Sequence, residues 1–563
     1  MKTMFTLLFL FPALTLTTFA DGTPAWPPGE SISWAWEYAA DALPNEADVH
    51  WSTNLNAGTD AVLEADGLRV LDQSSQPGSL RRYTRSWRVD PAVGGVIEAR
   101  IKVVDNNQFC GVGLMLADGV HEAHLTLYPD RVDMNNGTAT HAMNTTDGFH
   151  TYRLAARGND FLLWVDGEQV IDGTDRHTYP AHSSRCRVSF GSGASAAVSE
   201  AIYASVRYAP LGELPLPDRV PSAQDVVVYK EPGIYACFPS MYRTEDGDLV
   251  ASFGTRVRRS HIDGTGGGAA RISKDGGYTW VPLEGRRPLN PAARCADGSV
   301  VVADAYGWRE VPADRRGEFD KKNITVRDVR EGVVAYLQGA RVRRSTDDGV
   351  TWTDEELDLP PHQSVMSYNR VDQASLSPGL RVVSIYGNLK ENAHSRAFLL
   401  RSEDDGKDWQ FLPLAAQDGV DLNETALAQN AKGELVAMIR SEPPAGGHLY
   451  VAISTDAGLT WEPARKTELW GYPAHLLRLL DGRMLCTYSY RHTPMGIRAA
   501  ISPDGGRTWN AEDEVILRND GMHHGSDLGY PISIETEPGH IVTIYYMTND
   551  DGVTHVAVTH WDV

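Results

Sequence analysis

The residues of this sequence that could do chemistry are charged side chains set into apolar strands. Glu424 leads into the strand-like segment 425–427, and Arg440 ends the apolar run that begins at Met438, 16 residues beyond Glu424. Charged side chains are poor core material, so both are expected at an open end of the fold. At such a place a carboxylate can exchange a proton and a guanidinium group can bind an anion.

The net charge of the chain limits the kinds of macromolecule that could bind it. The chain has 52 Lys and Arg against 74 Asp and Glu, a formal net charge of −22. Nucleic acids and anionic membrane surfaces attract basic proteins, so neither is expected as a partner. An acidic ligand would need a local cluster of arginines. With 42% apolar and 22% charged residues, the composition is that of a globular protein.

The five cysteines show no spacing typical of a zinc ribbon or a disulfide framework. Cys110 and Cys186 could pair within the first half of the chain, and the sequence leaves this open. We expect neither a metal ion nor an organic cofactor.

The length and two segments predict the organisation of the chain. Its 563 residues exceed what one hydrophobic core organises, which favours two domains. Residues 1–20 are typical of a signal peptide, with Lys2 before an apolar run and a cleavage site after Ala20. The mature protein is therefore expected to be secreted or periplasmic, without membrane insertion. Residues 209–224 contain four prolines and are expected to form a linker.

Residues 21–208 predict an antiparallel β-sandwich. Short runs such as 96–103 and 122–127 alternate apolar and polar residues, the period of a half-buried strand. Residues 161–170 predict a hairpin that turns on Asp166-Gly167, and no segment predicts a helix. That hairpin resembles a strand pair of laminin-G or concanavalin-like jelly rolls. Such domains bind sugars or act as spacers, and the sequence leaves both roles open.

Residues 225–563 carry two superimposed repeats. Five segments share one turn-like pattern: SKDGGYTW (273–280), STDDGVTW (345–352), SEDDGKDW (402–409), STDAGLTW (454–461) and SPDGGRTW (502–509). Six strand–turn–strand segments lie between them and begin at Phe238, Asn290, Ser364, Asn423, Tyr472 and Tyr530. The turn patterns start 72, 57, 52 and 48 residues apart, and a β repeat of about fifty residues predicts a closed propeller. The expected fold is therefore all-β, a jelly-roll-like sandwich followed by a six-bladed β-propeller.

This combination of turn pattern and six-fold β repeat resembles the sialidase (neuraminidase) superfamily. The resemblance implies that Tyr530 is the catalytic nucleophile, that Glu424 polarises it and that Asp263 is the general acid and base. Arg440 matches one member of the family's three-arginine clamp for a substrate carboxylate. Arg491 and Arg498 both suit another clamp position, and the resemblance favours Arg498.

Arg256 matches a further arginine of the family's pocket, while two other positions depart from the pattern. Cys237 stands where the first clamp arginine is expected, and Tyr546 stands where a glutamate braces that arginine. A glutamate that kept its position after the loss of its arginine partner would be an unpaired buried charge, which destabilises a folded protein. The two replacements are therefore consistent with each other. They indicate a remodelled carboxylate pocket.

The predicted function is that of an exported exo-glycosidase of sialidase type, which removes terminal sialic acid or a related acidic sugar from glycans. One alternative is another exo-glycosidase or a lyase on the same propeller, for which His523 and His524 could supply acid–base chemistry. The others are a non-catalytic carbohydrate-binding protein and an extracellular adhesion or scaffold module.

Overall fold

The computed structural model divides the chain into two compact units, residues 1–215 and 216–563. The structure describes the residues in the following ranges: 26–29, 32–53, 58–73, 81–181, 186–193, 198–257, 266–305, 308–321, 324, 326–337, 339–357, 359–360, 362–368, 370–389, 394–442, 447–522 and 526–563. The unit boundary lies inside the predicted linker, and the predicted signal peptide lies outside the described residues. Among the described helices, none has the length and hydrophobicity needed to span a membrane.

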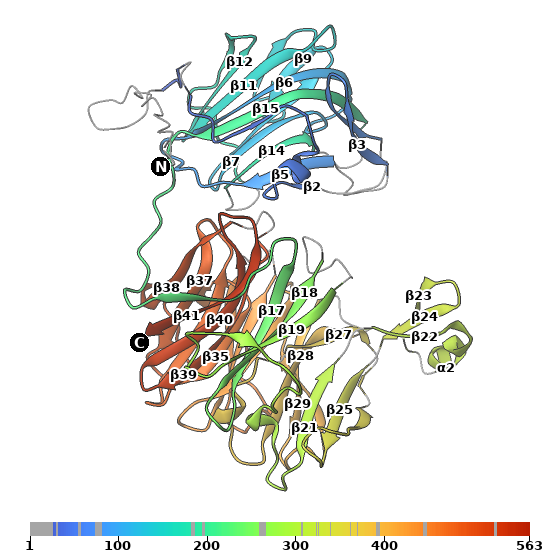
Figure 1. Cartoon of the computed structure of the whole chain (residues 1–563), viewed down its shortest axis with the longest axis vertical. Helices are drawn as coiled ribbons and strands as arrows, with labels where there is room; N and C mark the ends of the chain where they lie inside the picture. The colour runs from blue at the N-terminus through green and yellow to red at the C-terminus, as the bar shows by residue number, and fades with distance from the viewer. Residues whose placement is uncertain are drawn as a thin grey trace, which may run out of the picture. The chain divides into compact units, whose positions relative to one another are not determined.

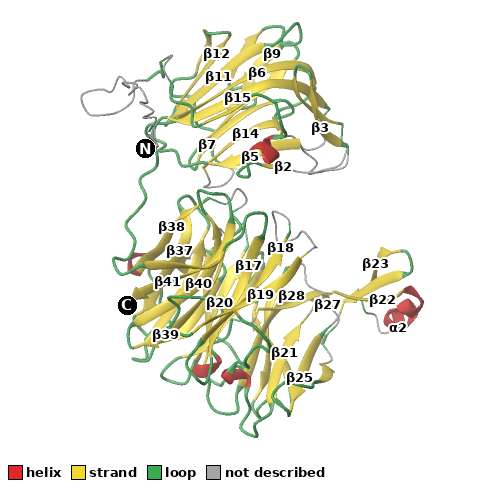
Figure 2. Cartoon of the chain, viewed as in Figure 1, coloured by secondary structure: helices red, strands yellow, loops and turns green. Residues whose placement is uncertain are grey.

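Unit 1 consists of two antiparallel sheets (Figures 1 and 2). The eight-stranded sheet contains β1 (Trp36–Tyr38), β3 (Thr59–Glu64), β4 (Gly67–Asp72), β6 (Gly95–Asn106), β11 (His150–Arg157), β12 (Asp160–Val165), β13 (Glu168–Asp172) and β15 (Ser199–Pro210). The seven-stranded sheet contains β2 (Ser52–Thr53), β5 (Arg81–Ser86), β7 (Gly113–Asp118), β8 (Glu122–Tyr128), β9 (Arg131–Met134), β10 (Ala139–Ala142) and β14 (Cys186–Ser192). Alternate side chains of both sheets form one core, which includes Trp51, Phe161 and Phe190.

The structure agrees with most local expectations for unit 1. Val165 pairs with Glu168, and Asp166 and Gly167 have φ values of 51° and 88°, the combination that a tight two-residue hairpin requires. One short helix, α1 (Pro44–Ala47), was not predicted, because four residues are too few to show a helical period.

Cys110 and Cys186 do not form the disulfide that the sequence left open. Both are free thiols. The Cys186 thiol donates instead to the Asp118 carbonyl at 3.0 Å.

Unit 2 contains six consecutive sheets in its described residues, each with its strands hydrogen-bonded in up-and-down order. Sheet 1 is β17 (Tyr235–Arg243), β18 (Leu249–Arg256), β19 (Gly266–Ser273) and β20 (Val281–Pro282); sheet 2 is β21 (Val300–Ala305), β25 (Ala340–Ser345) and β26 (Thr353–Leu357). Sheet 3 is β27 (His362–Tyr368), β28 (Arg381–Leu389), β29 (Arg396–Ser402) and β30 (Gln410–Ala415); sheet 4 is β31 (Leu422–Gln429), β32 (Leu435–Ser441), β33 (His448–Ser454) and β34 (Arg465–Trp470). Sheet 5 is β35 (Ala474–Arg478), β36 (Met484–Tyr490), β37 (Met495–Ser502) and β38 (Glu514–Gly521); sheet 6 is β39 (Gly529–Glu537), β40 (His540–Thr548), β41 (Thr554–Asp562) and β16 (Gln224–Tyr229). The predicted all-β class, a sandwich followed by a propeller, is confirmed.

The five repeated turns join the third and fourth strands of sheets 1 to 5 through one hydrogen-bond pattern. In the first, Ser273 Oγ accepts from the Gly277 N–H at 2.7 Å and the Asp275 carboxylate accepts from the Thr279 N–H at 2.9 Å. The Trp280 indole N–H donates to the Gly277 carbonyl at 2.8 Å. The serine and aspartate bonds recur in the other four turns. The indole bond recurs in three of them, whereas the Trp461 N–H of the fourth turn has no partner among the described residues. The repeated residues thus serve the turns themselves.

Sheet 2 departs from the predicted repeat. The inner strand expected from Asn290 is instead a short 3₁₀ turn, η1 (Pro291–Ala293), followed by one isolated bridge from Arg294 to Val300. A proline cannot donate to a sheet ladder, which accounts for the missing strand.

An insertion between β21 and β25 lengthens the same repeat. It forms its own sheet of β22 (Trp308–Pro312), β24 (Val333–Leu337) and β23 (Val326–Arg330), together with α2 (Arg316–Lys321). Figure 1 shows it standing out from the rest of unit 2, and it has a small core of its own around Phe319 and Tyr336. This insertion explains the 72-residue spacing of the first two repeated turns.

A buried histidine predicts acid sensitivity of unit 2. Burial lowers the pKa of His475, on β35, to about 3. As the pH falls below about 6.5, the unfolded chain binds a proton at His475, whereas the folded chain does not. The free energy of unfolding therefore falls by about 1.4 kcal/mol per pH unit. We expect His475→Gln to remove about 2 kcal/mol of the pH dependence between pH 6.5 and 5, measured by denaturant unfolding. Equal slopes for the two proteins would contradict this, and above pH 7.5 their difference should be constant.

Candidate active site

Three of the predicted site residues form one hydrogen-bonded chain. The Tyr530 hydroxyl donates to Glu424 Oε1 at 2.6 Å, although the two residues are 106 positions apart. Arg440 Nη1 donates to the other oxygen of the same carboxylate, Oε2, also at 2.6 Å. Arg440 reaches a second carboxylate as well, Glu442, at 2.7 Å. The carboxylate of Glu424 is therefore held by a cation on one side and faces a phenol on the other.

Bulges in the inner strands aim these side chains. Asn423 and Glu424 of β31 together oppose the single residue Arg440 of β32. On β39, Tyr530 and Pro531 likewise interrupt the pairing with β40, between Gly529 and Ile532. A bulge adds a residue and redirects its side chain, a device common beside active sites.

Sheet 1 has a bulge of the same kind at the equivalent position of its inner strand. Phe238 and Pro239 interrupt the pairing of β17 with β18. Phe238 and Tyr530 both have positive φ, 51° and 50°, and their rings meet edge to face with centroids 4.7 Å apart. In each case the residue that follows is a proline, which needs no ladder hydrogen bond. The two aromatic rings therefore meet because their strands are bulged alike.

The surroundings of Tyr530 keep its hydroxyl protonated. Burial and then the negative charge of Glu424 raise the pKa of Tyr530 well above the usual tyrosine range, while Arg440 and Arg491 oppose the shift. A neutral phenol beside a carboxylate can lose its proton to that carboxylate as the oxygen attacks an electrophile. The arrangement suits a nucleophile that is activated only during reaction.

Arginines converge on this site. The guanidinium groups of Arg440 and Arg491 lie over the ring of Tyr472, with Cζ 4.4 and 5.1 Å from its centroid. Arg491 also donates to the Leu528 carbonyl at 2.9 Å, two residues before Tyr530. Four arginines in or beside the site each have a buried Nε without a hydrogen-bond partner: Arg256, Arg370, Arg440 and Arg491. Unsatisfied buried donors of this kind are what an anionic ligand would satisfy.

Arg498 has a different environment. Its guanidinium group bonds to Glu514 and lies over the ring of Tyr490, with Cζ 3.5 Å from the centroid. Glu514 also accepts from the Tyr488 hydroxyl. Among the interactions of the described residues, none joins Arg498 to Tyr530. The structure therefore brings Arg491, and not the preferred Arg498, to the nucleophile candidate.

The two departures from the family pattern lie in one cluster. Asp527 accepts from the Tyr235 hydroxyl at 2.6 Å and from the Tyr546 hydroxyl at 2.5 Å. Cys237 is buried in the same apolar cluster as both tyrosines. Burial and then Asp527 raise the pKa of the Cys237 thiol to about 11, and Arg256 opposes them. A carboxylate with two phenol donors thus lies near the position expected for an arginine.

Sequence reasoning missed Asp527 and Arg370, and three of its candidates lie outside the described residues. Arg370 donates to the Pro239 carbonyl at 2.7 Å and so bridges sheets 3 and 1. A charged residue just after an apolar inner strand, the signal that marked Arg440, could have identified it. Asp263, His523 and His524 lie outside the described residues. Within the described residues no group of His, Cys, Asp and Glu is arranged to hold a metal ion.

Space for a ligand lies beside the bulge of sheet 1. An open depression of about 500 Å³ is lined by Phe238 and Phe253, by small residues of β17 to β19 and by Arg287. This volume is within the range of small-molecule sites. Because Phe238 contacts the ring of Tyr530, the depression adjoins the hydrogen-bonded chain.

Part of this chain is similar in sequence to known proteins. Residues 328–544 match the BNR repeat-like domain family. A curated relative named "Sialidase", from Micromonospora viridifaciens, is 25% identical over 244 residues, which cover 40% of this chain and 35% of the relative. The chain thus matches about a third of that relative's length. The two findings support a place in the sialidase/BNR superfamily.

Solved structures with a similar chain path include one of a protein of unknown function from Dyadobacter fermentans, 29% identical, with a TM-score of 0.47. That match covers 61% of this chain and all of the other. Another is the intramolecular trans-sialidase of Ruminococcus gnavus with oseltamivir carboxylate, 12% identical, with a TM-score of 0.41. It covers 62% of this chain and 98% of the other.

The environment of Arg498 predicts a role in stability. Removal of Arg498 leaves Glu514 buried without its cation, and breaking such a pair costs about 3 kcal/mol. We expect Arg498→Ala to lower the free energy of unfolding by about this amount in denaturant titrations. Arg483→Ala is the control, because Arg483 and Asp481 form a half-exposed pair whose loss should cost less than about 0.5 kcal/mol. Equal losses for the two variants would refute the assignment.

Proposed function

We propose that unit 2 is an exo-glycosidase of sialidase type that hydrolyses a terminal acidic sugar, with Tyr530 as nucleophile. The observation that carries the proposal is the hydrogen bond from Tyr530 to Glu424, whose carboxylate is fixed by Arg440. A phenol has no need of a buried glutamate for packing alone, and the pair is poised for proton transfer.

The chemistry follows from the charge of the substrate. When the anomeric carbon bears a carboxylate, an ionised Asp or Glu nucleophile would be repelled, whereas a neutral phenol is not. The Tyr530 oxygen attacks the anomeric carbon while its proton passes to Glu424. Asp263 is proposed to protonate the departing oxygen. It then activates the water that attacks the same carbon and releases Tyr530, with the proton returning from Glu424.

The arginines define how an acidic sugar would bind. Arg440 and Arg491 are proposed to hold the carboxylate, with Arg256 and Arg370 at the edge of the pocket. The missing arginine at Cys237 removes a charge-assisted contact that is typically worth about 1.5–3 kcal/mol. Asp527 adds a negative charge on the same side. The substrate carboxylate is therefore expected toward Arg440 and Arg491, away from Cys237.

Asp527 also favours a second candidate, the same mechanism on a neutral sugar. Its carboxylate accepts from the Tyr235 and Tyr546 hydroxyls, and a negative charge on this side of the pocket would repel an acidic sugar but not a neutral one. A panel of fluorogenic glycosides separates the candidates. It would contain N-acetylneuraminic acid, a deaminated ulosonic acid, a uronic acid and neutral hexosides. Release from the acidic sugars alone supports the first candidate, and release from neutral hexosides supports the second.

Removing the nucleophile or its base should abolish turnover. We expect Tyr530→Phe and Glu424→Gln each to lower kcat by roughly 10²–10⁴, because either change ends proton transfer at the attacking oxygen. The measurement is steady-state release of the fluorophore from the best glycoside of the panel. Tyr229→Phe is the matched control, because that hydroxyl also donates to a glutamate, Glu231, but in an exposed position. Unchanged turnover in Tyr530→Phe would exclude Tyr530 as nucleophile.

Arg491 should set the preference for a carboxylate. We expect Arg491→Met to lower kcat/KM for an acidic sugar roughly 10- to 100-fold, and to leave a neutral analogue nearly unchanged. The comparison uses two fluorogenic sugars that differ only in the carboxylate. An equal fall on both would mean that Arg491 acts by holding the Leu528 segment in front of Tyr530. Arg483→Met serves as the control for loss of an exposed arginine.

A further inference from the structure

The outer face of the seven-stranded sheet in unit 1 carries a second set of reactive side chains. The Cys110 sulfur lies 3.3 Å from His124 Nδ1, and His124 Nε2 lies 3.0 Å from Glu122 Oε2. Arg187 donates to the other oxygen of Glu122 at 2.7 Å. A thiol, an imidazole and a carboxylate are therefore joined in series.

The hydrogen bonds define the protonation of the imidazole. Although burial raises the pKa of Glu122, the bond from His124 and the charge of Arg187 bring it down to about 2. An ionised carboxylate only accepts hydrogen bonds, so Nε2 carries the ring proton. Nδ1 is then left with a lone pair directed at the Cys110 thiol. His124 is thus oriented as a base for this sulfur.

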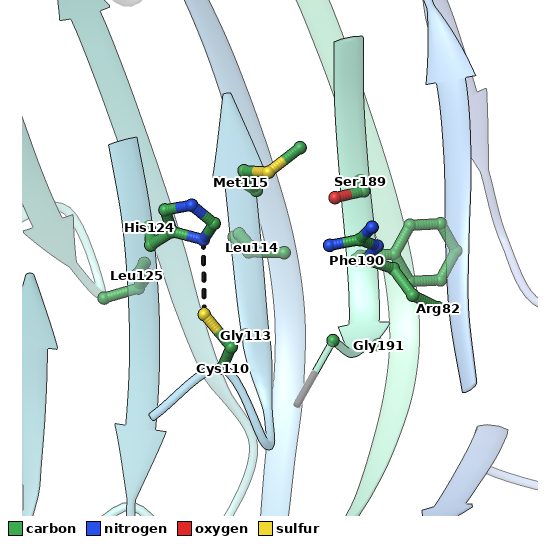
Figure 3. Close-up of a pocket in the computed structure, with 11 residues that line it drawn as sticks. Arg82, Cys110, Gly113, Leu114, Met115, His124, Leu125, Ser189, Phe190 and Gly191 are labelled. Atoms are coloured by element: carbon green, nitrogen blue, oxygen red, sulfur yellow. Dashed lines mark hydrogen bonds between the residues drawn. The ribbon is translucent and has the colours of Figure 1, made fainter. Parts of the chain in front are cut away.

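A small pocket opens beside the sulfur. Cys110 and His124 line one side, and Arg82 and Ser189 lie across it (Figure 3). The side chain of Ser189 is fully buried, and its hydroxyl has no hydrogen-bond partner. A buried hydroxyl without a partner marks a place for a small polar ligand. Burial raises the pKa of the Cys110 thiol, and the positive charge of Arg82 opposes this rise.

The size of the pocket limits the ligand. Its volume of about 20 Å³ is enough for one water-sized group, for which about 10–15 Å³ is needed. A sugar, a peptide or a bulky organic hydroperoxide does not fit. Hydrogen peroxide has only two heavy atoms and is little larger than water, can accept hydrogen bonds from Arg82 and Ser189, and reacts with sulfur. We propose that Cys110 is a modification site that hydrogen peroxide oxidises to a sulfenic acid with His124 as base.

The oxidation balances without another reactant. The thiol proton moves to His124 Nδ1, and the sulfur electron pair forms a bond to the nearer peroxide oxygen. The O–O bond breaks, and the departing oxygen takes the proton from His124 and leaves as water. The sulfur is oxidised by two electrons and the peroxide is reduced. The unassisted thiol is unreactive, since burial raises the pKa of Cys110 to about 12; the reaction therefore depends on His124.

The other four cysteines of the chain are built-in controls. All four are buried. Cys237 is the closest match, because it has an arginine neighbour, Arg256, but no histidine contact among the described residues. Cys110, by contrast, is only partly buried and has both an arginine and a histidine.

The test treats the full chain with hydrogen peroxide in the presence of dimedone, which traps sulfenic acids, and follows each cysteine by peptide mass spectrometry. We expect Cys110 to be trapped at least about 10-fold faster than Cys237 and the remaining three. His124→Gln should slow Cys110 roughly 100-fold without changing the other four. Arg82→Met should slow it roughly 10-fold.

His150→Gln is the control variant, because that imidazole is held between Asp147 and Asp166 and has no cysteine contact among the described residues. Slow trapping of the buried Cys186, the other cysteine of unit 1, reports that each variant is folded. Cys110 reacting no faster than Cys237 would overturn the proposal, and so would an unchanged rate in His124→Gln.

Discussion

The pairing of β16 with β41 is the constraint on which the rest of unit 2 depends. It joins the first strand of the unit to the last, so that sheet 6 is completed by residues from both ends. β39, the inner strand of that sheet, is then fixed beside β17 of sheet 1, and Phe238 meets Tyr530. The packing of β39 on β35 of sheet 5, and of β35 on β31 of sheet 4, then sets the position of Tyr530 relative to Glu424, two sheets away.

Within the closed ring, local irregularities rather than regular strands make the site. Glu424, Phe238 and Tyr530 all lie in bulges of inner strands. Gly529 allows the last of these, because a Cβ there would lie 1.6 Å from Ser489 Oγ, and its φ of 107° is unfavourable for other residues. A regular ladder would direct successive side chains to alternate faces of the sheet. The bulges instead direct them toward a common point, where the hydrogen bond between Tyr530 and Glu424 forms.

Sequence patterns predicted what is local and repeated. The Asp166-Gly167 hairpin, the repeated turns and most inner strands could be predicted because each depends on a few adjacent residues. The sequence also indicated Glu424, Arg440 and Tyr530, which the structure brings together. It favoured Arg498 over Arg491, because the sequence does not show that Glu514 is the partner of Arg498. The pairing of Asp527 with Tyr235 could not be predicted for the same reason, because the two residues are 292 positions apart.

If the proposed function holds, the presence of Cys237 where the resemblance places a clamp arginine is a change that involves both charged partners. A buried arginine and its bracing glutamate are stable only together, since either one alone leaves an unpaired buried charge. Here a thiol and Tyr546 take the two positions, and the charge that remains nearby, Asp527, receives two phenol hydrogen bonds. These bonds are short and go to an ionised acceptor, which makes them stronger than bonds between neutral groups. On the proposed function, the pocket therefore exchanges a cation for a carboxylate held by two phenols on one side, while Arg440 and Arg491 keep the other side positive. Such a polarised pocket would discriminate between the two ends of a sugar ring, a property that a ring of three arginines around one carboxylate does not have.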